Sequence, residues 1–132
     1  MLRVGIRGDQ KSVVKEKDTA IKVGSGEIEV LSTPSMISLM EKTAYESVQN
    51  YISDGTTTVG VSISVKHICP TPVGNAIRCE SELIEIDGKN LVFEVMAYDD
   101  FGMIGKGIHE RRIVDSQYFM MKALLKSSGH SN

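Results

Sequence analysis

The fold of this chain is decided by residues 33–53, which read TPSMISLMEKTAYESVQNYIS, and by residues 56–69, which read TTTVGVSISVKHIC. In the first stretch apolar residues recur every three or four positions, which predicts one long amphipathic helix. Thr33 suits the N-cap of this helix, Pro34 suits its first turn, and Gly55 follows its end. In the second stretch apolar and polar residues alternate, which predicts a long, half-buried strand.

One acidic residue interrupts the apolar face of the predicted helix. At 100° per residue the apolar stripe is formed by Ile37, Met40, Ala44, Val48 and Ile52. Glu41 falls inside this stripe, between Val48 and Ile52 on the helical wheel. A carboxylate in apolar surroundings costs on the order of several kcal/mol unless it is paired or neutralised. Glu41 is therefore either held by a structural hydrogen bond or a salt bridge, for example to Arg111, or part of a functional site.

Three further strands are expected at residues 76–86, 91–98 and 103–114, after a turn at 70–74 and with tight turns at Asp87-Gly88 and at 99–102. Together with the strand at 56–69 they are expected to form an antiparallel meander. Between residues 11 and 30 the sequence indicates a strand followed by an irregular or short helical connection. After Val114, apolar residues between 118 and 125 predict a short terminal helix that docks on the sheet or on a partner.

These elements define an α+β fold. A helix of about 20 residues is roughly 30 Å long and needs a broad apolar surface, which a twisted sheet can supply. We therefore expect an antiparallel sheet wrapped around a long central helix. Such a sheet leaves open edges that must be covered or paired with another subunit, so we expect a homodimer and leave assembly beyond the dimer open.

Composition narrows the class of protein. The 132 residues, 41% of them hydrophobic, are expected to form one domain over 1–132, with fraying at 1–10 and 127–132. The net charge of -2, with both signs mixed along the chain, argues against a nucleic-acid partner. No signal peptide or membrane span is visible, so we expect a cytoplasmic protein without a membrane partner. Cys69 and Cys79 lack the spacing of a metal or redox site and are expected to be buried thiols.

Three polar residues could form a catalytic site. Glu41 lies on the apolar face of the helix, and His67 lies on the apolar face of the first long strand, with Val59 and Val61. Taken singly, His67 could be a hydrogen-bonded core histidine and Thr33 a plain N-cap. Taken together, a hydroxyl, an imidazole and a carboxylate are the parts of an activated nucleophile, in which the base accepts the hydroxyl proton and the acid orients or charges the base.

The glycines of the strands have different interpretations. Gly60 either marks a bulge that bends the sheet or lets a ligand approach the backbone, where its N–H could face an oxyanion. The glycines at 102, 105 and 107 suit bends in the sheet and do not form a nucleotide-binding motif, because no strand-to-helix turn follows them. His109 cannot be oriented from the sequence, and the chain lacks the ligand spacing of a metal site, so no metal is expected.

Several motifs in order resemble one enzyme family. These are Thr33-Pro34-Ser35-Met36 leading to Leu39-Met40-Glu41, Thr57-Thr58-Val59-Gly60, His67, Pro70-Thr71-Pro72-Val73-Gly74 and Gly107-Ile108-His109-Glu110-Arg111. Over residues 11–122 the chain resembles the hotdog-fold thioesterases of the fluoroacetyl-CoA thioesterase-like family. The resemblance implies a hotdog fold, an acyl-CoA thioester substrate with no other cofactor, and an active site at a dimer interface.

The resemblance also implies roles for individual residues. Thr33, Glu41 and His67 match the catalytic trio of the family, Gly60 matches its backbone oxyanion donor, and Arg111 matches an arginine that supports the substrate or the charges of the site. Thr33 and Glu41 are separated by about 12 Å of helix rise, so either His67 bridges them or a second subunit contributes, and we favour composite sites. We expect His67 to act as base toward Thr33 or water, and Glu41 to act as nucleophile or charge partner.

The chain departs from the fluoroacetyl-specific members in one stretch. Those members use phenylalanines in a lid, whereas this chain has no Phe before Phe93 and carries Gly24-Ser25-Gly26-Glu27 in the corresponding stretch. We therefore expect a different short or medium acyl group. Two alternatives remain open at this point: a non-catalytic acyl-CoA-binding module, and a hotdog hydratase acting on enoyl thioesters, which resembles a different arrangement of acid and histidine.

Overall fold

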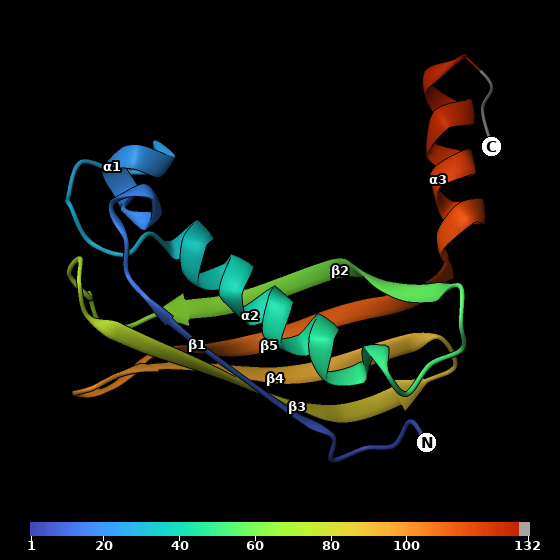
Figure 1. Cartoon of the computed structure of the whole chain (residues 1–132), viewed down its shortest axis with the longest axis horizontal. Coiled ribbons are helices and arrows are strands. Elements are labelled where there is room, and N and C mark those ends of the chain that lie inside the picture. Colours follow the sequence, from blue (N-terminus) through green and yellow to red (C-terminus); the bar gives the residue numbers. More distant parts are fainter. Residues whose placement is uncertain (130–132) are drawn as a thin grey trace.

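In the computed structural model, which describes residues 1–129, a five-stranded antiparallel sheet packs against one long helix (Figure 1). This arrangement confirms the predicted α+β class. The strands are β1 (Arg7–Val13), β2 (Thr56–His67), β3 (Ala76–Asp87), β4 (Asn90–Asp99) and β5 (Gly102–Asp115). The helices are the 3-10 helix η1 (Glu16–Asp18), α1 (Ala20–Val23), the central helix α2 (Thr33–Gln49) and the terminal helix α3 (Ser116–Ser127).

The ends of α2 differ from the prediction. Ser32, not Thr33, is the N-cap, because its side chain accepts a hydrogen bond of 3.1 Å from the Ser35 backbone N–H. Thr33 is the first helical residue, so its hydroxyl is free for another partner. The helix ends at Gln49, not at residue 53, and the chain then turns through Gly55, which has a φ of 81°.

One hydrophobic core lies between α2 and the sheet. Residues of α2 that face it are Met36, Met40, Thr43, Ala44 and Val48. On the sheet side it is filled by apolar residues of β3, β4 and β5, among them Leu83, Leu91, Phe93, Val95 and Ile104, all at most 1% exposed. The predicted stripe is therefore confirmed at Met40, Ala44 and Val48, whereas Ile37 and Ile52 are only partly buried.

The strand order is β1-β3-β4-β5-β2, so only β3, β4 and β5 form a meander. The prediction that β2 joins this meander beside β3 is wrong, because β2 pairs with β5 at the opposite side of the sheet. The connection at 68–75 does not form a hairpin, since its backbone bonds elsewhere: Leu31 N–H donates to Thr71 O at 2.8 Å, and Gly74 N–H donates to Val14 O at 2.8 Å. The outer edges of the sheet are therefore β1 and β2.

A bulge in β2 changes which side chains face α2. The pairing of β2 with β5 shifts between Gly60 and Ser62, and Val61 is 57% exposed. The prediction that Val59, Val61 and His67 share one uninterrupted face is therefore wrong. Gly60 and His67 are seven residues apart and would lie on opposite faces of a regular strand, but the bulge brings both to the face that α2 covers.

The N-terminal segment belongs to the sheet. Gly5 N–H donates to Leu83 O and Leu83 N–H donates to Ile6 O, each at 2.8 Å, and β1 begins at Arg7. The expected fraying of residues 1–10 is therefore wrong for most of them. At the other end, residues 130–132 of the segment expected to fray lie outside the described residues.

The two cysteines differ in their surroundings. Cys79 is buried in the core, as predicted, and burial raises the pKa of its thiol to about 12, with a smaller contribution from Asp9. Cys69 is exposed, so the prediction that it is buried is wrong. The reason is that β2 ends at His67, which leaves Cys69 in the connection that follows.

The terminal helix α3 projects from the end of β5 and does not dock on the sheet (Figure 1). None of its residues is buried. Docking of α3 on the sheet of its own chain is therefore wrong, while docking on a partner stays a prediction. Within residues 1–129 there is no helix whose length and hydropathy suit a membrane crossing.

Candidate active site

Thr33 and His67 form a direct pair. The distance between Thr33 Oγ1 and His67 Nδ1 is 2.9 Å. Thr33 is the first residue of the helix α2, and His67 is the last residue of the strand β2. The N-terminus of a helix carries a partial positive charge, which favours negative charge developing on an oxygen there. The pair therefore has the geometry in which an imidazole takes a proton from a hydroxyl.

The surroundings of His67 keep its imidazole neutral. Burial lowers the pKa of His67 below its usual value, against a smaller opposing effect of a hydrogen bond with the Cys69 backbone. Its second nitrogen, Nε2, is buried and has no hydrogen-bond partner among the described residues. A neutral imidazole is the form that can accept a proton, so the environment of His67 suits a general base.

A cleft of about 340 Å³ opens beside this pair. Thr33 and His67 line it together with residues 25–28 and 68–70. We call it the Thr33–His67 cleft. The stretch 24–27, predicted to replace a phenylalanine-bearing lid, therefore forms part of its wall together with Ile28 and Val30. Cys69 also lines the cleft.

Glu41 has a different partner. Its carboxylate lies 3.7 Å from Arg111 Nη1, and the Glu41 side chain is 42% exposed whereas the Arg111 side chain is 8% exposed. Of the alternatives left open by the sequence, a salt bridge to Arg111 is thus confirmed within one protomer. The prediction of a carboxylate inside the apolar stripe is only partly right, because Glu41 lies at the border of the core and remains accessible from outside.

Residues of β2 and β5 hold the side chain of Arg111 in place. Its Nε donates to Thr58 Oγ1 at 2.7 Å and its Nη2 donates to Thr58 O at 2.9 Å. Its Nη1 lies 3.1 Å from His109 Nε2. Burial lowers the pKa of the guanidinium, while Glu41 and then Tyr45 oppose that effect. A buried cation with fixed donors can orient a neighbouring carboxylate or a developing negative charge.

His109 belongs to the same cluster, although its orientation could not be predicted from the sequence. Its Nδ1 lies 2.8 Å from Ser62 O, a carbonyl that can only accept, so Nδ1 carries the proton. Nε2 is then the acceptor for Arg111, which requires a neutral ring. Burial lowers the pKa of His109, as this role needs. The signal in the sequence was the spacing His109-x-Arg111, which puts both side chains on one face of β5.

Gly60 lies where Glu41, His109 and Arg111 meet, and we call these four residues the Glu41 cluster. A Cβ added to Gly60 would lie 2.8 Å from Glu41 Oε2 and 3.5 Å from both Arg111 Nη1 and His109 Cε1. The interpretation of this glycine as a bulge position is confirmed, because the pairing of β2 with β5 shifts between Gly60 and Ser62. The approach of a ligand to its backbone stays a prediction. Its role as oxyanion donor stays a prediction.

We expect Gly60→Ala to lower the rate of any reaction at this site by about 10- to 100-fold, because the methyl group must displace the Glu41 carboxylate by a fraction of an ångström or more. The fold should survive, since Gly60 does not need a positive φ and the carboxylate is the mobile end of its side chain. Steady-state kinetics and thermal melting check this. Ser64→Ala, on the same strand but away from the cluster, is the control, and an unaffected Gly60→Ala enzyme would contradict the tight approach.

The five predicted site residues form two groups within one chain. The structure brings Thr33 to His67, and it brings Glu41 to Arg111 and Gly60. Among residues 1–129 no hydrogen bond or salt bridge joins the two groups. Gly60 and His67 are seven residues apart on β2, on the order of 20 Å. His67 therefore does not bridge Thr33 and Glu41 in one protomer. In the described part of the chain, no three His, Cys, Asp or Glu side chains gather as a metal site.

Known proteins resemble this chain in fold and in sequence. The fluoroacetyl-CoA thioesterase of Streptantibioticus cattleyicolor is 32% identical over 99 residues, which are 75% of this chain and 71% of that protein. A solved structure of a fluoroacetyl-CoA thioesterase is 30% identical, with a TM-score of 0.90 over 96% of this chain and 98% of that one. A hot-dog-like protein from Thermanaerovibrio acidaminovorans, 22% identical, has a TM-score of 0.87 over 95% of this chain and 93% of its own.

The last of these similarities concerns the fold alone and confirms the predicted hotdog architecture. The family itself is shown by sequence: a model for fluoroacetyl-CoA-specific thioesterases matches residues 14–117. This range includes both halves of the site, from Thr33 to Arg111. The chain therefore belongs to the family of fluoroacetyl-CoA-specific thioesterases.

Proposed function

We propose that this protein is an acyl-CoA thioesterase with composite active sites in a homodimer. In each site Thr33 and His67 of one protomer act together with the Glu41 cluster of the partner. The observation that carries the proposal is the 2.9 Å contact between Thr33 Oγ1 and His67 Nδ1, at a cleft, in a chain that belongs to a thioesterase family. The need for a partner follows from the distance between this pair and Glu41 within one protomer.

The open edge of β2 suggests how two copies combine. β2 pairs with β5 on one side only, so its other edge can pair with a second copy. A two-fold axis makes the two β2 strands antiparallel. The half of β2 that carries Gly60 then runs beside the half of the partner's β2 that ends at His67. This arrangement would bring the two groups together without any change within a protomer.

The chemistry follows from the groups present. Neutral His67 accepts the proton of Thr33 or of water as the oxygen attacks the thioester carbonyl. Arg111 and the Gly60 N–H stabilise the oxyanion, and the thiolate of coenzyme A leaves and takes the proton that His67 accepted. Where Thr33 is the attacking oxygen, the acyl group stays on Thr33 until a water molecule, deprotonated by His67, releases it as the acid. The net reaction converts thioester and water into a carboxylic acid and free coenzyme A. Glu41 serves as the nucleophile or as the partner that balances charge, and no cofactor beyond the coenzyme A of the substrate takes part.

The acyl group is proposed from the wall of the cleft. The fluoroacetyl-CoA thioesterase sequence and structure compared above are named for a fluorinated substrate, whereas residues 24–30 of this chain include no phenylalanine. Gly24, Ser25 and Gly26 are smaller than phenylalanine, which leaves room for a longer acyl chain. We therefore propose a non-fluorinated short or medium acyl group. The working environment proposed is the cytoplasm, without membrane or nucleic-acid partners, and assembly beyond the dimer is left open.

The pH profile should reflect the surroundings of His67. Because burial lowers the pKa of His67, the base stays neutral to lower pH than an ordinary histidine. We expect kcat/KM to rise with pH as His67 loses its proton, with the midpoint below the usual value of about 6.5, and to level off near neutrality. A rate profile measured with one acyl-CoA from acidic to neutral pH checks this. A midpoint at or above the usual value would contradict it.

Release of free thiol from a panel of acyl-CoA esters tests the proposed function. Acetyl-, butyryl-, octanoyl- and fluoroacetyl-CoA separate short, medium and fluorinated groups. Turnover that is fastest with a non-fluorinated ester supports the proposal. Saturable binding without thiol release would favour a non-catalytic module, and hydration of an enoyl-CoA without thiol release would favour a hydratase.

A further inference from the structure

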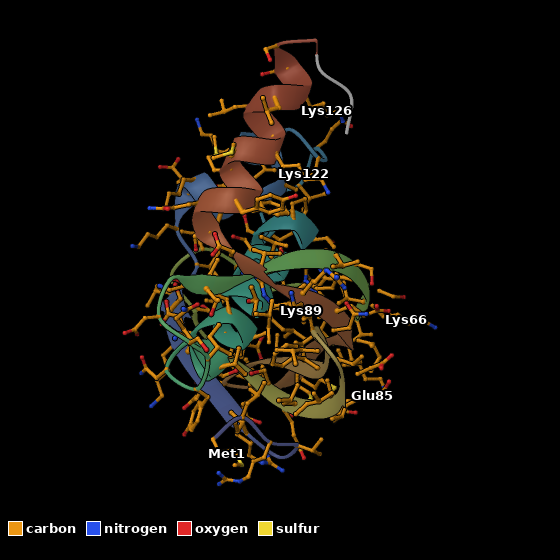
Figure 2. The ribbon with its side chains drawn as sticks, turned by 90° about the vertical axis from the view of Figure 1, so that its right-hand side faces the viewer. Met1, Lys66, Glu85, Lys89, Lys122 and Lys126 are labelled. Carbon is orange, nitrogen blue, oxygen red and sulfur yellow. The ribbon has the colours of Figure 1, made fainter. Side chains whose placement is uncertain are left out.

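The terminal helix α3 exposes an apolar surface that the chain itself does not cover. Tyr118, Met120, Met121 and Leu124 are 56% to 64% exposed, and Leu125 is 49% exposed. Figure 2 shows the helix standing away from the body of the molecule, with Lys122 and Lys126 along it. Apolar side chains that extend into water over about two turns of helix indicate an interaction surface.

Most of the exposed apolar residues of α3 form a stripe. At 100° per residue Met120, Leu124, Met121, Leu125 and Tyr118 lie on one side of the helix, with Gln117 between Leu124 and Met121. Phe119, 44% exposed, lies outside this stripe. The two lysines border this stripe at its Tyr118 side. The surface is therefore amphipathic, with a positive edge, and it suits a partner that offers apolar side chains and acidic groups.

The start of α3 is fixed to the start of β2. Ser116 N–H donates to Gly55 O at 3.0 Å, and Asp115 pairs with Thr56. His67 and the cleft lie at the other end of β2, twelve residues long. In Figure 1, α1 and α3 stand at opposite ends of β2 and both extend past its open edge. If two β2 strands pair antiparallel as in the proposed function, on which this inference rests, α3 of one copy meets the α1 end of the other.

The surface at that end matches α3 in both polarity and charge. Four apolar side chains there are exposed: Ile21 at 48%, Val23 at 43%, Ile28 at 66% and Ile68 at 49%. Two acidic residues, Glu27 and Glu29, are exposed beside Ile28. They can pair with the lysines of α3. Ile28 and Ile68 also line the Thr33–His67 cleft, so a helix on this surface covers the cleft.

We propose that α3 of each protomer packs over the Thr33–His67 cleft of the partner subunit and forms the outer wall of the acyl-binding end of the site. Methionine and leucine side chains adapt to aliphatic chains of different length. The helix thus adds an apolar outer wall to the apolar lining that Ile28 and Ile68 already provide. It helps to select which acyl chains bind.

Cross-linking to the native Cys69 tests this placement. A disulfide requires Cα atoms within about 7 Å, whereas Cys69 and α3 lie at opposite ends of β2, on the order of 35 Å apart, so a disulfide between them must join two chains. We expect Met121→Cys or Leu125→Cys to give covalent dimers under mild oxidation. Ala123→Cys, on the opposite face of α3, should not. The covalent dimers should disappear when Cys69→Ser is added.

A second measurement guards against a cross-link that fails through poor local geometry. The double variant Met121→Glu/Leu125→Glu places two carboxylates in the apolar stripe. It should lower the ratio of kcat/KM for octanoyl-CoA to kcat/KM for acetyl-CoA by about tenfold or more. An absent cross-link together with an unchanged ratio would overturn the inference, as would a cross-link that survives Cys69→Ser. If either of these results is obtained with a dimer that hydrolyses acyl-CoA, only the placement of α3 is wrong. If the protein cross-links as expected but does not hydrolyse acyl-CoA, only the proposed activity is wrong.

Discussion

His67→Ala is expected to lower kcat for acyl-CoA hydrolysis by about 10² to 10³ while the protein stays folded. The imidazole is the only base in contact with the Thr33 hydroxyl among the described residues, at 2.9 Å. Without it the hydroxyl, or a water molecule in its place, must lose its proton to solvent. The fold should be little affected, because His67 is at the end of an edge strand and its Nε2 has no partner in residues 1–129 to lose.

The comparison for this variant is Lys66→Ala, which removes the preceding side chain on the exposed face of the same strand. Thiol release, circular dichroism and light scattering would be measured for both proteins. Lys66→Ala should keep the parental rate. Parental activity in a folded His67→Ala dimer would show that another group is the base.

Glu41→Gln should also lower kcat by about 10² or more, with a smaller effect on KM. The amide keeps the size of the side chain but cannot act as a nucleophile or as a negative charge. Arg111 remains held by Thr58 and His109, so substrate binding should largely survive. Glu46→Gln, an exposed carboxylate on the same helix, is the matched control. A Glu41→Gln enzyme with full kcat would leave Glu41 with only the structural salt bridge.

The main elements of the fold could be predicted because their patterns are local. The alternation of β2 to β5 and the stripe of α2 set the strands and the helix to within a few residues. A bulge at Gly60 was one of two interpretations, and the sequence alone could not decide between it and a ligand contact. The position of β2 beside β5 depended on hydrogen bonds of residues 68–75 with distant backbone, which no local pattern reveals.

The site could be predicted as a set of residues but not as a geometry. Thr33 and His67 do meet, and the salt bridge of Glu41 with Arg111 was among the alternatives considered. His109 was missed because its role depends on a carbonyl of β2, 47 residues away. The Thr33–His67 pair and the Glu41 cluster lie far apart because α2 and β2 are long. The proposed mechanism therefore requires a partner subunit.

Mixing two inactive variants tests that requirement most directly. His67→Ala and Glu41→Gln chains would be unfolded together, refolded and assayed for thiol release beside each variant treated alone. In a mixed dimer one composite site contains an intact Thr33–His67 pair and an intact Glu41, while the other site lacks both His67 and Glu41. Random pairing should therefore restore about a quarter of the parental activity. A refolded mixture that forms mixed dimers but is no more active than its components would contradict composite sites.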